Sequence, residues 1–169
     1  MTVAVLGSAR ADGDAARLLD AVAPPDARRA DLGALRVRDY AYGRPAGGDD
    51  FLQLARDIAD ADGVLLVTPV YWYAMSAPMK RFVDRLTDLV TVEKPLGRRL
   101  GGRGLWLAAC GSDSALPDGF EVPFRRTAAY FGMVYGGAVY APSARLQTDG
   151  ERQRLAAFGA RVGAFRADR

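Results

Sequence analysis

The sequence predicts a doubly wound α/β protein, in which helices cover both faces of a parallel sheet. Four short apolar segments, each bounded by glycine, proline or charge, indicate strands at residues 2–6, 64–68, 105–110 and 134–140. These segments do not alternate strictly between apolar and polar residues, which is typical of strands buried on both faces. Helical patterns separate them, and a helix supplies the long connection that parallel neighbours need.

A fifth strand is expected at residues 28–32, before Gly33, and its charged start favours an edge position in the sheet. Helical patterns predict five helices, at residues 14–22, 50–60, 77–89, 122–132 and 150–165. The longest irregular stretches, 36–49 and 91–102, are rich in glycine and proline and are expected to be loops.

The helix expected at residues 77–89 has apolar residues at helical spacing. Ser76 is expected to cap it, with Pro78 in its first turn. Its charged residues are expected mostly on the opposite, outer face: Lys80, Arg81, Asp84, Arg85 and Asp88.

Length and composition favour one domain spanning residues 1–169. Cys110 is the single cysteine and cannot form an internal disulfide, and Met1 leads straight into a strand, so we expect a cytoplasmic protein. No apolar run approaches the roughly 18 residues of a membrane helix, which argues against membrane insertion. The net charge of +3 is mild and mixed in sign, so nucleic acid is not expected as a partner, and the basic excess at 94–103 is interpreted as a solvated loop.

The chain contains no histidine. Ser-His-Asp and Cys-His mechanisms are therefore excluded, because both need an imidazole to move the proton. A zinc site of histidine and cysteine ligands is also excluded, because such a site needs several ligands and the chain has one cysteine and no histidine, and no metal site is expected. Redox or transfer chemistry would need a cofactor.

In open α/β sheets, ligands bind beyond the carboxyl ends of the strands where the strand order reverses. The first loop in such a place, residues 7–14, can hold a phosphate, because its glycines admit an anion, Ser8 offers a hydroxyl and Arg10 a two-pronged donor. Its spacing matches neither a P-loop nor a dinucleotide fingerprint. The alternative is an ordinary turn capped by Asp12 or Asp14.

The second loop, residues 69–76, places Tyr71, Trp72 and Tyr73 directly after a buried strand. An aromatic cluster in a loop favours a flat ligand or a partner surface, and core packing is the alternative. The third loop, residues 110–113, is a weaker signal. There Gly111 and Ser112 can donate hydrogen bonds to a ring edge, whereas the thiol before them is expected to be inert core.

At these loops the sequence resembles the family of NADPH-dependent FMN reductases and flavodoxin-like oxidoreductases. Residues 68–85, TPVYWYAMSAPMKRFVDR, are similar to the family's flavin-ring loop and the helix behind it. Residues 7–13, GSARADG, resemble its phosphate loop, and residues 110–112 stand where its third flavin loop begins.

The resemblance implies a flavodoxin-like three-layer sandwich with a five-stranded parallel sheet of order 2-1-3-4-5. It implies FMN as cofactor, with the phosphate at the first loop and the ring against the second and third loops, and no side chain with a catalytic role. The cofactor-binding residues that it implies are Ser8, Arg10, Gly13, Asp14, Ala15, Pro69, Val70, Tyr71, Trp72, Tyr73, Cys110, Gly111 and Ser112.

One departure concerns the end of the phosphate loop, where the family usually has Asn-Thr and this chain has Asp14-Ala15. Ala15 offers no hydroxyl, and the carboxylate of Asp14 would repel a phosphate unless it turns away. This difference predicts weak FMN binding or a different ligand.

The function that follows from the resemblance is electron transfer from NADPH or NADH through the flavin to a small-molecule acceptor, such as a quinone, an azo or nitro compound, free flavin or a ferric chelate. A homodimer or homotetramer is also implied. Two alternatives remain open: a flavodoxin-type electron carrier, and a flavodoxin-like domain that has lost FMN and acts as an interaction module. The slightly basic charge weighs against the carrier, because carriers of that kind are usually acidic.

Overall fold

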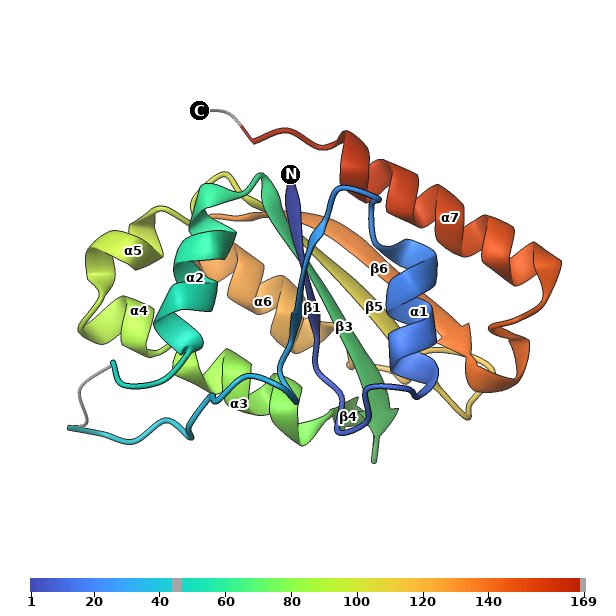
Figure 1. Ribbon diagram of the computed structural model, residues 1–169, viewed down its shortest axis with the longest axis horizontal. Helices are drawn as coiled ribbons and strands as arrows, with labels where there is room; N and C mark the ends of the chain where they lie inside the picture. Colours follow the sequence, from blue (N-terminus) through green and yellow to red (C-terminus); the bar gives the residue numbers. More distant parts are fainter. Residues whose placement is uncertain (44–46, 168–169) are drawn as a thin grey trace.

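Five parallel strands form the centre of the computed structural model, which describes residues 1–43 and 47–167 (Figure 1). Their order across the sheet is β2-β1-β3-β5-β6, so the predicted order of five parallel strands is confirmed, with β2 at an edge. A sixth strand, the two-residue β4, pairs antiparallel with the end of β3 and was not predicted. The strands are β1 (Thr2–Leu6), β2 (Arg28–Asp31), β3 (Gly63–Tyr71), β4 (Ala74–Met75), β5 (Gly104–Gly111) and β6 (Val134–Pro142).

Helices cover both faces of this sheet, as predicted (Figure 1). One face packs against α1 (Asp14–Val22) and α7 (Asp149–Ala164). The other face packs against the remaining helices: α2 (Phe51–Asp60), α3 (Ala77–Arg85), α4 (Asp88–Thr91), α5 (Lys94–Arg98) and α6 (Val122–Tyr130). A short 3₁₀ helix, η1 (Ser143–Arg145), leads from β6 into α7.

The three central strands are apolar because they have helices above and below. Each of the five residues of β1 is buried, as are the first seven of both β3 and β5. The two helices of one face touch closely at Gly159, where a Cβ atom would lie 2.6 Å from the carbonyl oxygen of Val22. Helices thus bury both faces of the sheet. The loops that follow β1, β3 and β5 lie at its carboxyl edge.

Three predicted bounds were wrong. The strand expected at 64–68 continues to Tyr71, because its last residues pair with β4. The helix expected at 77–89 ends at Arg85 and is followed by the separate short helix α4. The stretch 91–102, expected to be a loop, contains α5, whose start is favoured by a proline in its first turn. The cap was predicted correctly, since the hydroxyl of Ser76 accepts from the backbone N–H of Met79 at 3.3 Å.

The outer face of α3 was also predicted wrongly, because Arg85 and Asp88 are both only 4% exposed. Nε of Arg85 donates to Asp88 at 2.7 Å, Nη1 donates to the buried carboxylate of Asp49, and the guanidinium lies 4.6 Å from the centre of the Phe51 ring. Burial alone would raise the pKa of Asp49, but the hydrogen bonds from Arg85 and from the backbone N–H groups of Arg38 and Phe51 outweigh it, and that pKa lies below its ordinary value. This ion cluster fastens the segment before α2 to α3.

Candidate functional site

The carboxyl ends of β1, β3 and β5 bring the three predicted loops to one edge of the sheet. After β1 the chain enters α1 on one face, and after β3 it enters α3 on the other, so the strand order reverses between these two neighbours. Figure 1 shows the start of α1, the β4 hairpin and the start of α3 together at the lower edge. This is the position at which open α/β sheets bind ligands.

The first loop, residues 7–14, presents hydrogen-bond donors at the start of α1. The hydroxyl of Ser8 accepts from the backbone N–H of Arg10 at 3.1 Å, which folds the loop into a tight turn. Gly13 is the N-cap of α1 and supplies no side-chain acceptor, so the N–H groups of the first helical turn are available to an anion. The guanidinium of Arg10 is 71% exposed, with Asp12 at 3.5 Å. These groups make a donor set that suits a phosphate.

The two residues that depart from the family pattern have different environments. Nη1 of Arg17 donates to the carboxylate of Asp14 at 3.0 Å, so the negative charge of Asp14 is paired on the surface of α1. Ala15 is 2% exposed, and its methyl group packs in the core with the buried face of α1. Neither Asp12 nor Asp14 caps the helix, so the alternative of an ordinary carboxylate-capped turn is wrong.

The second loop is a tight β-hairpin that carries three exposed aromatic side chains. Two residues form its turn, Trp72 with φ 49° and Tyr73 with φ 62°. Two-residue hairpin turns with a positive φ at both positions usually have the sequence Asn-Gly. Trp72 is 93% exposed, Tyr73 70% and Tyr71 47%. Core packing is therefore excluded as the reason for this aromatic cluster.

Hydrogen bonds join the hairpin to the first loop. The hydroxyl of Ser76 donates to the carbonyl of Gly7 at 2.5 Å, and the backbone N–H of Ser76 donates to the hydroxyl of Thr68 at 3.1 Å. Gly7 lies so close to α3 that a Cβ atom there would be 2.7 Å from the Cβ of Met79. The two loops are thus held in a fixed relation by buried groups.

The third loop follows β5 and packs against β6. Burial, with a smaller contribution from the charge of Asp14, raises the pKa of the Cys110 thiol to about 12, so this thiol stays neutral and unreactive. A Cβ atom at Gly111 would lie 3.0 Å from the hydroxyl of Tyr140 and 3.2 Å from the Cβ of Val70. Glycine at this position therefore lets the second and third loops and β6 approach one another closely.

A hollow of about 180 Å³ lies between the second and third loops. Its lining includes five of the predicted residues and two more: Val70, Trp72, Tyr73, Gly111, Ser112, Asp113 and Tyr140. The hydroxyl of Tyr140 donates to the carbonyl of Asp113 at 2.9 Å and so holds the third loop against β6. No sequence signal marked Tyr140, which stands at the end of the fourth predicted strand and belongs to the site only through the strand order.

The remaining predicted residues lie outside this lining. Pro69 and Cys110 are buried within their strands, and Tyr71 is half-exposed beside the hairpin turn. The predicted residues of the first loop line no part of the hollow, but the contact between Ser76 and Gly7 brings the two loops together. The edge therefore has two parts, an anion-binding loop and an aromatic hollow.

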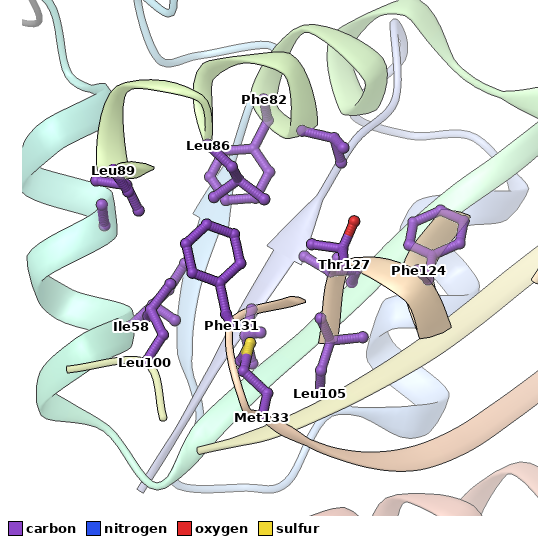
Figure 2. A pocket seen from close by; sticks show the side chains of 14 residues that line it. Ile58, Phe82, Leu86, Leu89, Leu100, Leu105, Phe124, Thr127, Phe131 and Met133 are labelled. Atoms are coloured by element: carbon purple, nitrogen blue, oxygen red, sulfur yellow. The ribbon is translucent and has the colours of Figure 1, made fainter. Parts of the chain in front are cut away.

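A second cavity, on the α3 face of the sheet, is a gap in the core. Figure 2 shows Phe82, Leu86, Phe124 and Phe131 around it, contributed from the region of α3 and α6. Its volume is about 30 Å³, and its walls are almost entirely hydrocarbon. A space of this size and polarity holds no flavin or nucleotide. The hollow at the carboxyl edge is the candidate site because of its position, beside the point where the strand order reverses.

Clusters of metal ligands and membrane-spanning helices are both absent from the described residues, 1–43 and 47–167. Within these ranges no three acidic, cysteine or histidine residues come together as metal ligands. Nor does any helix in the same ranges have the length and apolar character needed to cross a membrane.

Comparison with known proteins agrees with this geometry. Over residues 1–143 the sequence matches the family described as NADPH-dependent FMN reductase. A segment of 97 residues is 29% identical to an iron-sulfur flavoprotein from Archaeoglobus fulgidus, over 50% of this chain and 44% of that protein. This chain thus spans less than half of the length of that relative.

Solved structures with low sequence identity share the fold. The Trp repressor binding protein from Bacillus subtilis is 20% identical, with a TM-score of 0.70 over 99% of this chain and 100% of that one. An NADPH-quinone reductase from P. pentosaceus is 16% identical, with a TM-score of 0.66 over 95% of each chain. An FMN-dependent NADH-azoreductase from Bacillus anthracis is 10% identical, with a TM-score of 0.67 over 95% of this chain and 98% of that one.

The family match covers most of the chain and includes all three loops, so it confirms the resemblance on which the site was predicted. The chain belongs to the family of NADPH-dependent FMN reductases.

Proposed function

We propose that the protein transfers electrons from NADPH or NADH, through FMN bound at the carboxyl edge, to a small flat acceptor. The acceptor classes that fit are quinones, azo and nitro compounds, free flavin and ferric chelates. The observation that carries the proposal is the hollow between an exposed aromatic hairpin and the third loop, next to a loop whose donors suit an anion.

The donors of the first loop fit the phosphate of FMN. Ser8 offers a hydroxyl, Arg10 an exposed guanidinium, and the start of α1 offers backbone N–H groups at Gly13, Asp14 and Ala15. Because Ala15 faces the core, we assign it a backbone role only. Because Asp14 is paired with Arg17, we infer that its charge lowers the affinity for FMN without abolishing binding.

The second and third loops fit the flavin ring. Val70, Trp72 and Tyr73 of the second loop line the hollow that would hold the ring, together with Gly111 and Ser112 of the third loop. FMN, once bound, supplies the redox chemistry by taking two electrons from a reduced nicotinamide and passing them on. The chain's own residues bind and orient: the hairpin offers flat apolar surface, and Tyr140 holds the third loop in place through Asp113.

We assign no side chain a proton-transfer role in this reaction. The chain has no histidine, and the thiol of Cys110 is buried with a pKa of about 12. The role of the protein is therefore to position the reactants, to keep one face of the ring accessible and to set its electronic environment.

Titration of the purified protein with FMN, followed by anaerobic addition of NADPH or NADH, tests the proposal. We expect quenched FMN fluorescence on binding, bleaching of the flavin by at least one nucleotide, and recolouring on addition of a quinone. A protein that binds no FMN would contradict the proposal and support the alternative of an interaction module. Reduction by a nucleotide with no turnover of any small acceptor would support an electron carrier.

We also propose a homodimer or homotetramer in the cytoplasm. Trp72 and Tyr73 expose large apolar rings beside the hollow, and a second copy of the chain would cover them. Light scattering with and without FMN measures the mass, and a monomer under both conditions would contradict this part.

A further inference from the structure

A groove of about 280 Å³ lies on the surface between α4, α5 and the end of α6. Tyr130 and Phe131, which line it, stand shortly before β6 begins, so the groove lies toward the amino ends of the strands. The candidate flavin site lies at their carboxyl ends. Figure 1 shows α5 on the left of the molecule, away from the β4 hairpin. The groove is therefore separate from the site that the proposed function uses.

Two exposed cations belong to the lining of this groove, Lys94 and Arg98. They are one turn apart on α5, so their side chains leave the same face of that helix. In the part of the chain that the structure describes, neither cation forms an ion pair, and no acidic residue lines the groove. This side of the groove therefore attracts an anion.

The rest of the lining is apolar or aromatic. Tyr130, the last residue of α6, is 73% exposed, and its ring meets the ring of Phe131 edge-on with the centres 5.6 Å apart. Leu89 and Val90 of α4 complete the apolar surface. A Cβ atom at Gly97 would overlap the carbonyl oxygen of Leu89, so glycine there allows α5 to lie directly on α4. This contact brings the cations of α5 next to hydrocarbon.

The gap in the core lies directly beneath the groove, since Leu89 and Phe131 line both. Figure 2 shows these two side chains beside the gap, among other hydrocarbon side chains. A protein interior is normally close-packed, which prevents a side chain in such a wall from moving inward. Here the space of about 30 Å³ behind it gives Phe131 room to move inward and to deepen the groove for a hydrocarbon chain.

We propose that this groove is a second binding site, for dissolved carboxylates that carry a hydrocarbon chain. The carboxylate lies at Lys94 and Arg98, and the chain lies along Tyr130 and Phe131, above the core gap. Charge and apolar surface then each meet their complement in one ligand. A small anion would leave the apolar surface uncovered, and a neutral chain would leave the two cations without a partner.

The test compares three ligands with one chain length and three head groups: octanoate, 1-octanol and octylammonium. Calorimetry measures their affinities for the full chain, and NMR shifts of the methyl groups of Leu89 and Val90 report where they bind. Two exposed ion pairs should favour octanoate over 1-octanol by about 2- to 30-fold, with octylammonium the weakest. Equal binding of octanoate and 1-octanol would overturn the proposal, as would octanoate binding that leaves both methyl signals unmoved.

The double substitution Lys94→Gln with Arg98→Gln should abolish this preference and leave the affinity for 1-octanol unchanged. Arg99→Gln with Arg103→Gln is the matched control, because it removes the same charge from residues that follow α5 closely but line a different hollow. The control should keep the preference. An unchanged preference in the first variant, or an equal loss in both, would overturn the assignment of the carboxylate to Lys94 and Arg98.

Tyr130→Ala tests the apolar part of the site. Because the side chain of Tyr130 is largely exposed, its loss leaves the core intact, and binding of octanoate and 1-octanol should weaken by the same factor. Unchanged binding of both would overturn the placement of the chain.

FMN provides the test of location. Saturating FMN should leave the affinity for octanoate unchanged, because the two sites lie at opposite ends of the strands. Displacement of octanoate by FMN would overturn the proposal of a separate site. The octanoate titrations do not require FMN, so failure of FMN binding would contradict the proposed function and leave this test in force.

Discussion

The turn of the aromatic hairpin stores backbone strain that a substitution can release. Trp72 and Tyr73 both have positive φ, a conformation in which the Cβ atom of an L-residue crowds its own backbone. Asn and Gly are the residues that adopt this turn with least strain. We therefore predict that the double substitution Trp72→Asn with Tyr73→Gly stabilises the protein and weakens the binding of flat ligands.

The magnitude follows from strain and burial. The left-handed conformation costs about 1–2 kcal/mol for each residue other than glycine, so the two positions store about 2–4 kcal/mol. Little burial is lost, because Trp72 is 93% exposed and Tyr73 70%. The freedom that Gly adds to the unfolded chain offsets about 0.5–1 kcal/mol. We expect a net gain of about 1–3.5 kcal/mol in the free energy of unfolding and, at about 2–4 °C per kcal/mol for a chain of this length, a rise in Tm of about 2–14 °C.

Urea denaturation followed by circular dichroism measures the gain, and FMN titration measures the loss of ring binding. Trp72→Phe is the control, because it keeps both an aromatic ring and the strained conformation, and its stability should stay close to that of the parent. A double variant that unfolds at lower urea than the parent, with the same dependence on urea, would refute the assignment of strain to this turn.

Three other substitutions or treatments test the remaining parts of the structure. Arg10→Ala should weaken the binding of FMN by about 1.5–3 kcal/mol, which is the contribution of a hydrogen bond to a charged group, and should leave the binding of riboflavin unaffected. Fluorescence titrations measure both affinities, and an equal loss for both ligands would show that Arg10 does not contact the phosphate. Asp49→Asn should cost about 3 kcal/mol of stability, because it leaves the buried guanidinium of Arg85 short of a partner, whereas Asp39→Asn, at an exposed pair with Arg81, should cost less than about 1 kcal/mol. Because the pKa of Asp49 is lowered on folding, its contribution to stability is present above the ordinary carboxyl pKa and is lost as the pH falls through the folded pKa. The free energy of unfolding should therefore fall less steeply with acid in Asp49→Asn than in the parent. An equally steep fall would contradict this. Cys110 should not react with a thiol reagent at pH 8 until the protein is unfolded, since its pKa is about 12, and rapid labelling of the folded chain would contradict its burial.

The sheet and most helices could be predicted from the sequence because their signals are local. β1 and α1 begin and end where the apolar run and the helical pattern do. The ring loop was recognised because an aromatic cluster after a buried strand is unusual in any local context. The exposure of those rings followed from the hairpin, which extends β3 by pairing with a strand of only two residues, too short to give a pattern of its own.

The misplaced residues share a different cause, because each depends on a partner that is distant in sequence. Helical spacing predicts Arg85 on the outer face of its helix. In the structure its side chain is buried, because it forms an ion pair with Asp49, 36 residues away in the sequence. Tyr140 joins the site through its contact with Asp113, 27 residues earlier. Spacing along one helix or strand contains no information about such partners, whereas the tertiary fold brings both pairs together.

If the chain needed only a turn after β3, Asn and Gly would be the favoured residues at positions 72 and 73. This chain instead has Trp72 and Tyr73 there, both strained and both exposed to solvent. Strain of this kind persists only where the surroundings over-determine the conformation, and it gathers at functional sites. Here the pairing of β3 with β4 and the buried hydrogen bonds of Ser76 constrain the conformation of the turn. The same bonds fix the hairpin to the first loop, so the distance between the anion donors and the aromatic rings is set by the core. A cofactor with a phosphate at one end and a flat ring at the other would use both groups, so we interpret the strained turn and the donor loop as two parts of one site.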